Sequence, residues 1–130
     1  MLKGKIGFAG EGWGAVSAVK GLKKNFEIQA LTEDETVLSE MDSTDTAVNF
    51  FEEFECEIVV CAGYRPLIKK EILEKYDVIN IHYSLLPAYR GLHSTAWAIL
   101  NGEEELGLTI FRINQFMDDG PIIYQKAFEN

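Results

Sequence analysis

The chain has 130 residues, 47% of them hydrophobic and 25% charged, and a formal net charge of −9 at pH 7. These proportions are typical of one folded globular domain over residues 1–130 and exclude a disordered chain. The acidic balance argues against a broad grip on nucleic acid, and no apolar run approaches the ~20 residues of a membrane span, so we expect neither partner.

The first half of the chain alternates strand and helix patterns. Met1–Lys5 lacks the long apolar stretch of a signal peptide, so we expect a cytoplasmic protein. The pattern predicts strands over 5–9, 26–32 and 57–62, and helices over about 15–24 and 44–54, the second capped by Ser43 or Thr44. Cys56 and Cys61 flank the third strand, which predicts buried reduced thiols and no metal site.

A glycine cluster, Gly10-x-Gly12-x-Gly14, follows the first predicted strand. It approaches the dinucleotide-binding fingerprint, and Glu33 or Asp34 lies about where a ribose-binding acid would stand. The third glycine, however, comes one position early. We therefore favour a tight turn that lets a helix pack closely on a strand, and we keep a nicotinamide- or nucleotide-binding module as an alternative.

The second half continues the alternation and then changes. A helix is predicted over 66–76 with Pro66 in its first turn, followed by a strand over 77–82 and a helix over 93–101. Two further strands, 106–113 and 122–128, are predicted to pair in an antiparallel manner. The fold class is therefore α/β, with a mostly parallel sheet, antiparallel strands at its C-terminal end, and helices covering both faces.

Asn80 and His82 stand two residues apart on the 77–82 strand, so both side chains point to the same face. They lie at the carboxyl end of that strand, where open α/β sheets place their ligand crevices. If the loop that carries Asp118 folds back over this crevice, its carboxylate can orient the imidazole and favour the imidazolium. The sequence therefore predicts His82 as a general base and Asn80 as a hydrogen-bond donor to a developing oxyanion.

Several motifs together resemble one family. Asn80-x-His82-x-Ser84-Leu85-Leu86-Pro87, Arg90-Gly91, Trp97-Ala98-Ile99, Asn101-Gly102-Glu103, Gly107-x-Thr109 and Met117-Asp118-x-Gly120-x-Ile122 are similar to the folate-dependent formyltransferases. The resemblance implies a Rossmann-like three-layer sandwich and transfer of a formyl group from 10-formyltetrahydrofolate to an amine. It also implies that the catalytic asparagine, histidine and aspartate correspond to Asn80, His82 and Asp118.

The resemblance also implies where the two substrates bind. The pterin slot of the family is built largely from backbone, which corresponds here to Tyr64, Arg65, Pro66, Leu67, Ile68, Gln115, Phe116 and Met117. The amino-acid sequence around the catalytic strand is most similar to that of family members that formylate nucleotide-linked amino sugars. Ser84, Tyr89, Arg90, Gly91 and His93 are the expected contacts of such a substrate, because Arg90 and the start of the following helix can hold a phosphate.

Three alternatives stay open alongside the amino-sugar acceptor. They are a glycinamide-ribonucleotide acceptor, the nicotinamide-dependent or nucleotide-binding module named above, and a protein that binds folate or a sugar nucleotide without catalysis. The chain is short for the family, which predicts a minimal version of the catalytic domain with an uncovered strand edge or core face. We expect a second copy of the chain to cover it in a homodimer, and small molecules as its substrates.

Overall fold

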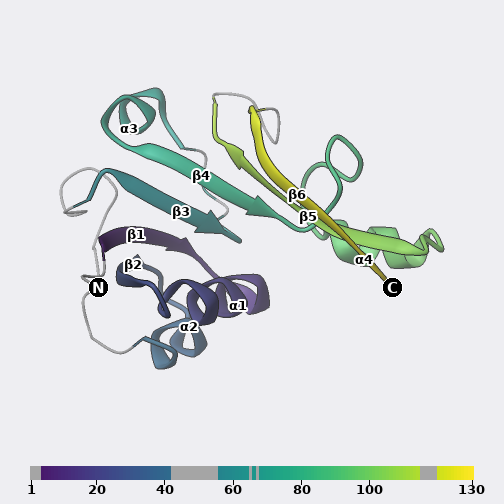
Figure 1. Ribbon diagram of the computed structural model, residues 1–130, viewed down its shortest axis with the longest axis horizontal. Helices are drawn as coiled ribbons and strands as arrows, with labels where there is room; N and C mark the ends of the chain where they lie inside the picture. The colour runs from purple at the N-terminus through teal and green to yellow at the C-terminus, as the bar shows by residue number, and fades with distance from the viewer. Residues whose placement is uncertain (1–3, 42–55, 65, 67, 115–119) are drawn as a thin grey trace. The chain divides into compact units, whose positions relative to one another are not determined.

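The computed structural model describes residues 4–41, 56–64, 66, 68–114 and 120–130. The elements follow one another as β1 (Gly4–Gly10), α1 (Gly12–Leu22), β2 (Phe26–Leu31), α2 (Glu35–Ser39), β3 (Ile58–Ala62), α3 (Lys70–Lys75), β4 (Asp77–His82), α4 (Ser94–Leu100), β5 (Glu105–Arg112) and β6 (Ile122–Glu129) (Figure 1). The chain divides into two compact units, Met1–Val78 and Ile79–Asn130. Within the described ranges, no helix is both long and apolar enough to cross a membrane.

The first unit is built on parallel strands. β1 lies between β2 and β3 and pairs in parallel with both. Phe8 and Val59 are fully buried, as expected for parallel strands covered on both faces. α1 buries Ala15, Val16 and Val19, a spacing that places small apolar side chains on one stripe of the helix. These buried side chains belong to the apolar core of the first unit.

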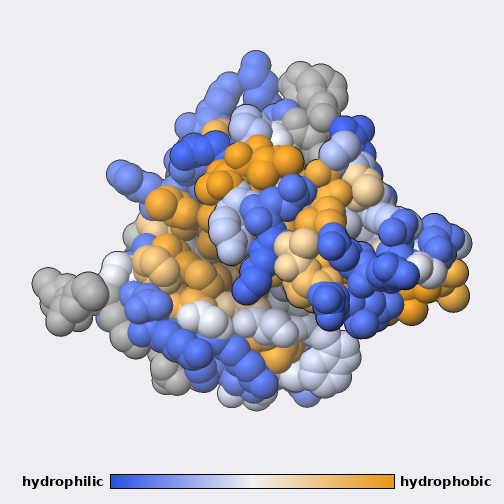
Figure 2. Space-filling model, turned by 45° about the vertical axis from the view of Figure 1, so that its right-hand side comes forward, coloured by the Kyte–Doolittle hydropathy of each residue, from blue (hydrophilic) through white to orange (hydrophobic). Residues whose placement is uncertain are grey.

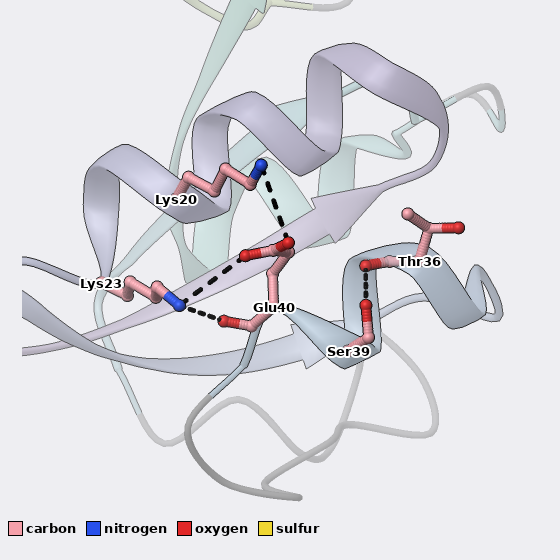
Figure 3. A network of polar contacts seen from close by, with 5 residues as sticks. All are labelled: Lys20, Lys23, Thr36, Ser39 and Glu40. Atoms are coloured by element: carbon pink, nitrogen blue, oxygen red, sulfur yellow. Dashed lines mark hydrogen bonds and ion pairs between the residues drawn. The ribbon is translucent and has the colours of Figure 1, made fainter.

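A polar network joins the ends of α1 and α2 in the same unit (Figure 3). Lys23 donates from Nζ to the Glu40 carbonyl oxygen at 2.8 Å. The Glu40 carboxylate lies 3.8 Å from Lys23 Nζ and 3.7 Å from Lys20 Nζ. Ser39 Oγ donates to the Thr36 carbonyl at 2.7 Å and closes the last turn of α2. Such partly exposed ion pairs contribute little stability, so the network mainly fixes the path of the chain.

The second unit is antiparallel. β5 pairs with β4 on one side and with β6 on the other. Along β5 the residues Gly107, Thr109 and Phe111 are buried, because alternate side chains point to the same face. β6 is exposed along its whole length and carries large apolar residues, among them Tyr124 and Phe128. Figure 2 shows that hydrophobic areas lie at the surface of the molecule between hydrophilic ones.

The fold class predicted from the sequence is confirmed, and the strand predictions agree closely with the observed strands. Four details were wrong. α1 begins at Gly12, three residues before the predicted start of this helix, so Gly12 and Gly14 belong to the helix and not to the turn before it. α3 begins at Lys70, so Pro66 precedes the helix instead of occupying its first turn. α2 was not predicted, and Cys56 is half-buried, whereas Cys61 is buried as expected. The helix predicted over 44–54 lies outside the described residues.

Candidate active site

β4 presents Asn80 and His82 on one face of the second unit. Their partners on β5 are Phe111 and Thr109, both buried, and residues directly opposite in an antiparallel pair share a face. His82 is itself buried, and Asn80 is half-buried. A buried imidazole therefore stands beside an amide at the carboxyl end of a strand.

The ring of His82 is held by a backbone carbonyl. His82 Nε2 lies 2.7 Å from the carbonyl oxygen of Tyr89. Because a carbonyl oxygen can only accept, the hydrogen of this bond belongs to Nε2. In the neutral ring the lone pair is then on Nδ1, which makes Nδ1 the nitrogen that can take a proton. The Tyr89 carbonyl thus contributes to fixing the tautomer of the ring. The role predicted for Asp118 stays a prediction, because Asp118 lies outside the described residues.

Tyr89 is anchored by its side chain as well. Its backbone has φ 56°, a left-handed conformation that is costly for a bulky residue. Its hydroxyl donates to Glu103 Oε1 at 2.8 Å and accepts from Asn101 Nδ2 at 3.3 Å. These bonds hold the residue whose carbonyl faces His82.

The loop between His82 and Tyr89 is tied down by side chains. Ser84 Oγ donates to the Ala88 carbonyl at 2.7 Å, so the hydroxyl of this predicted substrate contact is used within the loop. The Tyr83 carbonyl accepts from Ser94 Oγ at 2.9 Å and from Thr95 Oγ1 at 3.1 Å. The loop therefore has a defined shape without belonging to a sheet.

A cavity of about 160 Å³ lies beside this loop, lined in part by Tyr83, Tyr89, Glu103 and Glu105. Burial raises the pKa of the Tyr83 phenol, so this group stays neutral and able to donate a hydrogen bond. Among the described residues no cluster of potential metal ligands occurs.

The other predicted site residues fall into two groups. Asp118, Gln115, Phe116, Met117, Arg65 and Leu67 lie outside the described residues. Tyr64 is half-buried, and burial, together with Cys61, raises its pKa; Pro66 is exposed and Ile68 is buried in the first unit. In the second unit, Arg90 and His93 are exposed and Gly91 is half-buried.

The glycine cluster of the first unit has a structural explanation. A Cβ on Gly10 would lie 1.7 Å from the Ala62 carbonyl oxygen, so β1 and β3 approach closely only because this residue is glycine. Asp34 accepts from the Gly12 N–H at 2.7 Å and from the Thr36 N–H at 2.9 Å. These bonds lower the pKa of its carboxyl, with the Gly12 bond the largest cause. Asp34 thus caps α2 and closes the turn, which gives a structural role to the acid at the predicted ribose-binding position.

Sequence reasoning missed two residues of this site. Thr109 and Gln125 bond to the loop that follows His82, from β5 and β6. Thr109 belonged to a motif of the resemblance, but no role was inferred for it, and Gln125 carried no signal. A buried threonine opposite the candidate histidine was the available clue.

An α/β chain with an asparagine–histidine pair at a strand end is consistent with a group-transfer enzyme. The family model described as "Formyl transferase" matches residues 16–129, and the chain belongs to this family.

Relatives differ in their acceptors. The chain is 34% identical over 113 residues to a methionyl-tRNA formyltransferase of Wigglesworthia glossinidia brevipalpis, covering 85% of this chain and 34% of that protein. It is 41% identical over 75 residues to a GDP-perosamine N-formyltransferase of Brucella melitensis biotype 1, covering 56% of this chain and 29% of that protein. The chain thus spans about a third or less of these relatives.

Solved structures share the fold. A phosphoribosylglycinamide formyltransferase from Streptococcus pneumoniae TIGR4 superposes with a TM-score of 0.75 at 22% identity, covering 99% of this chain and 83% of that one. HypX from Aquifex aeolicus in complex with tetrahydrofolic acid gives 0.72 at 19% identity, covering 96% of this chain and 21% of that one. At these identities the likeness supports the fold alone.

Proposed function

We propose that this chain transfers a formyl group from 10-formyltetrahydrofolate to the primary amine of a nucleotide-linked amino sugar. One observation carries the proposal: Asn80 and His82 share a face of β4, with the His82 ring fixed by the Tyr89 carbonyl, in a chain of the formyl transferase family. This is the arrangement expected of a donor and a base that act on one reacting centre.

The reaction follows from the chemistry of these two side chains. The acceptor amine attacks the formyl carbon and a C–N bond forms, while the carbonyl oxygen gains negative charge. Asn80 donates its amide N–H to that oxygen. His82 takes a proton from the attacking nitrogen at Nδ1 and returns it to the folate nitrogen as the bond to the formyl carbon breaks. Asp118 remains our proposed third catalytic residue.

The formyl donor fits the groups that are present. An amide N–H and an imidazole lone pair on one face can meet the oxygen of a formyl group and the proton of its attacker, with no metal needed to balance the step. The residues proposed to hold the folate are Tyr64, Arg65, Pro66, Leu67, Ile68, Gln115, Phe116 and Met117. Membership of the formyl transferase family supports a folate donor.

The amino-sugar acceptor is supported by the similarity to the GDP-perosamine enzyme. The net charge of −9 disfavours a tRNA acceptor, because a protein must neutralise phosphates to hold tRNA. Similarity to methionyl-tRNA and glycinamide-ribonucleotide enzymes makes both of those acceptors necessary arms of the test. The cytoplasmic location and the homodimer remain predictions, and sedimentation showing a clean monomer would exclude the homodimer.

The deciding experiment measures formyl transfer from 10-formyltetrahydrofolate to nucleotide-linked amino sugars, glycinamide ribonucleotide and methionyl-tRNA. We expect turnover with an amino sugar, a loss of about 10²–10⁴-fold in His82→Ala and of about 10²–10³-fold in Asn80→Ala. Asp118→Asn is included as the third site variant. Asn25→Ala, a matched change at an exposed asparagine of the first unit, should leave turnover unchanged.

Each other outcome contradicts a stated part of the proposal. Turnover with only glycinamide ribonucleotide or only methionyl-tRNA would show that this compound, and not an amino sugar, is the acceptor. Binding of a reduced folate without turnover would indicate a protein that only binds. Thermal stabilisation by NAD but not by a reduced folate would favour the nucleotide-binding alternative, since a ligand at 100 times its Kd adds about 2.7 kcal/mol.

A further inference from the structure

Thr109 lies at the centre of a saturated polar cluster. Its side chain is fully buried on β5, directly opposite His82 on one side and Gln125 on the other. The hydroxyl donates to the Ser84 carbonyl at 2.7 Å and accepts from the Leu86 N–H at 3.1 Å. It also accepts from Gln125 Nε2 at 3.0 Å. One donor and two acceptor sites are all that a hydroxyl has, so every one is used.

Gln125 completes the cluster from β6. Besides its bond to Thr109, its Nε2 donates to the Leu86 carbonyl at 2.8 Å. Leu86 therefore has its N–H held by Thr109 and its carbonyl held by Gln125. The two side chains together fix the middle of the loop that begins at His82.

The same loop ends at the residue that fixes the His82 ring. It leaves β4 after His82, is bound at Ser84 and Leu86, and returns to place the Tyr89 carbonyl 2.7 Å from His82 Nε2. Thr109 is paired with His82 across the two strands and is also bonded to the loop that ends at Tyr89. The position of the Tyr89 carbonyl relative to the His82 ring therefore depends on the bonds of Thr109. A shift of the loop would move that carbonyl relative to Nε2.

We propose that Thr109 and Gln125 are positioning residues for the reaction: acting through residues 84–88, they hold the Tyr89 carbonyl on His82 Nε2 and so fix Nδ1 as the nitrogen that meets the amine. This inference rests on the proposed function and adds residues to the same site. A loop fixed in this way supplies a preorganised base, which must stay within a fraction of an ångström of its productive position.

Two substitutions at Thr109 separate the effect of its hydroxyl from the effect of its shape. Thr109→Val keeps the shape but leaves the Ser84 carbonyl and the Leu86 N–H without this partner. Thr109→Ser keeps the hydroxyl and serves as the conservative variant. Gln125→Leu removes the donor to Leu86 from an exposed strand, where folding is less at risk.

The first test reads the ring of His82 directly, without any substrate. The chain has two histidines, so 15N NMR of the imidazoles at alkaline pH gives two sets of signals, and His93→Gln assigns them. We expect His82 in the wild type to show a protonated Nε2 and an unprotonated Nδ1. In Thr109→Val and Gln125→Leu the two nitrogens should average between tautomers, in Thr109→Ser they should not, and His93 should stay unchanged.

The second test measures kinetics on the same variants. We expect kcat to fall about 10²-fold in Thr109→Val, as for other small misplacements of a catalytic group. The KM for the folate should change little, and Thr109→Ser should restore kcat. A loss of stability alone would not separate kcat from KM in this way.

Several results would overturn the proposal. A wild-type ring protonated on Nδ1, or Thr109→Val with unchanged ring signals and unchanged kcat, contradicts it. If Thr109→Val does not fold, Gln125→Leu decides by the same two readouts. If the wild type transfers no formyl group, the proposed function fails, while the ring spectra still show whether Thr109 and Gln125 position His82.

Discussion

Two turns of this chain each follow a strand of the sheet, and their hydrogen bonds serve different purposes. The turn after β1 in the first unit is rich in glycine, and the loop after β4 in the second unit begins at His82. In the first turn, the Gly12 N–H is taken by Asp34 and the glycines permit close backbone packing. In the second, side chains bond to the backbone of the loop, and the His82 imidazole and the Asn80 amide lie on one face of β4.

The function of such a motif therefore depends on which groups its backbone hydrogen bonds reach. In the glycine-rich turn, the Gly12 N–H is already bound within its own unit and is therefore less available to a phosphate. A loop whose carbonyls are bound by side chains can hold a catalytic ring in place. Substitutions in each unit test this contrast.

The largest effect is expected in the two cores. Phe8 in the first unit and Phe111 in the second are both almost completely buried. Phe8→Ala and Phe111→Ala should each lower the free energy of unfolding by about 3–5 kcal/mol in urea titrations. Only Phe111→Ala should also lower kcat under folded conditions, because Phe111 lies opposite Asn80. An equal loss of kcat in both variants would contradict the contrast between the units.

The glycine turn gives the next effect. Gly10→Ala should destabilise by about 3 kcal/mol or more, since the new methyl group would collide with the Ala62 carbonyl. Gly12→Ala is the matched control: it meets nothing within 4 Å, and only its φ of 84° strains the backbone, at about 1–2 kcal/mol. Thermal unfolding measures both. A smaller loss in Gly10→Ala than in Gly12→Ala would refute the packing explanation.

Removing the anchor of Tyr89 should have a modest effect on stability. Tyr89→Phe loses the bonds to Glu103 and Asn101, which should cost about 0.5–1.5 kcal/mol. The kcat should also fall at temperatures where the variant is still fully folded, because the Tyr89 carbonyl orients the His82 ring. Unfolding curves and kcat on one preparation test this, and unchanged turnover would count against the anchor.

The smallest effect concerns Asp34. Its pKa is lowered in the folded chain, so the carboxylate stabilises the fold fully above its ordinary pKa of 3.8. That contribution is lost as the pH falls through the lowered folded pKa. Asp34→Asn should therefore be less stable at neutral pH and less sensitive to acid below about pH 4 than the wild type. Urea titrations across this range decide, and parallel pH profiles would contradict the cap.

The sequence predicted the strand of the site well because its signal is local. β4 begins and ends at the predicted residues, since β-branched residues and their alternation mark a strand without reference to the rest of the chain. The cap at Asp34 was missed, because the same acid also suits a ribose-binding position and only its bonds to Gly12 and Thr36 distinguish the two.

Local sequence patterns were enough to predict the α/β alternation, the antiparallel pair at the C-terminal end, and the Asn80–His82 pair with its family resemblance. The folded chain was needed to show which ring nitrogen of His82 carries the hydrogen and which residues hold the loop. The reason is physical: a backbone carbonyl such as that of Tyr89 has no residue-specific signal, and Thr109 and Gln125 reach the loop across separations of 25 and 39 residues. Such contacts exist only after the strands have paired.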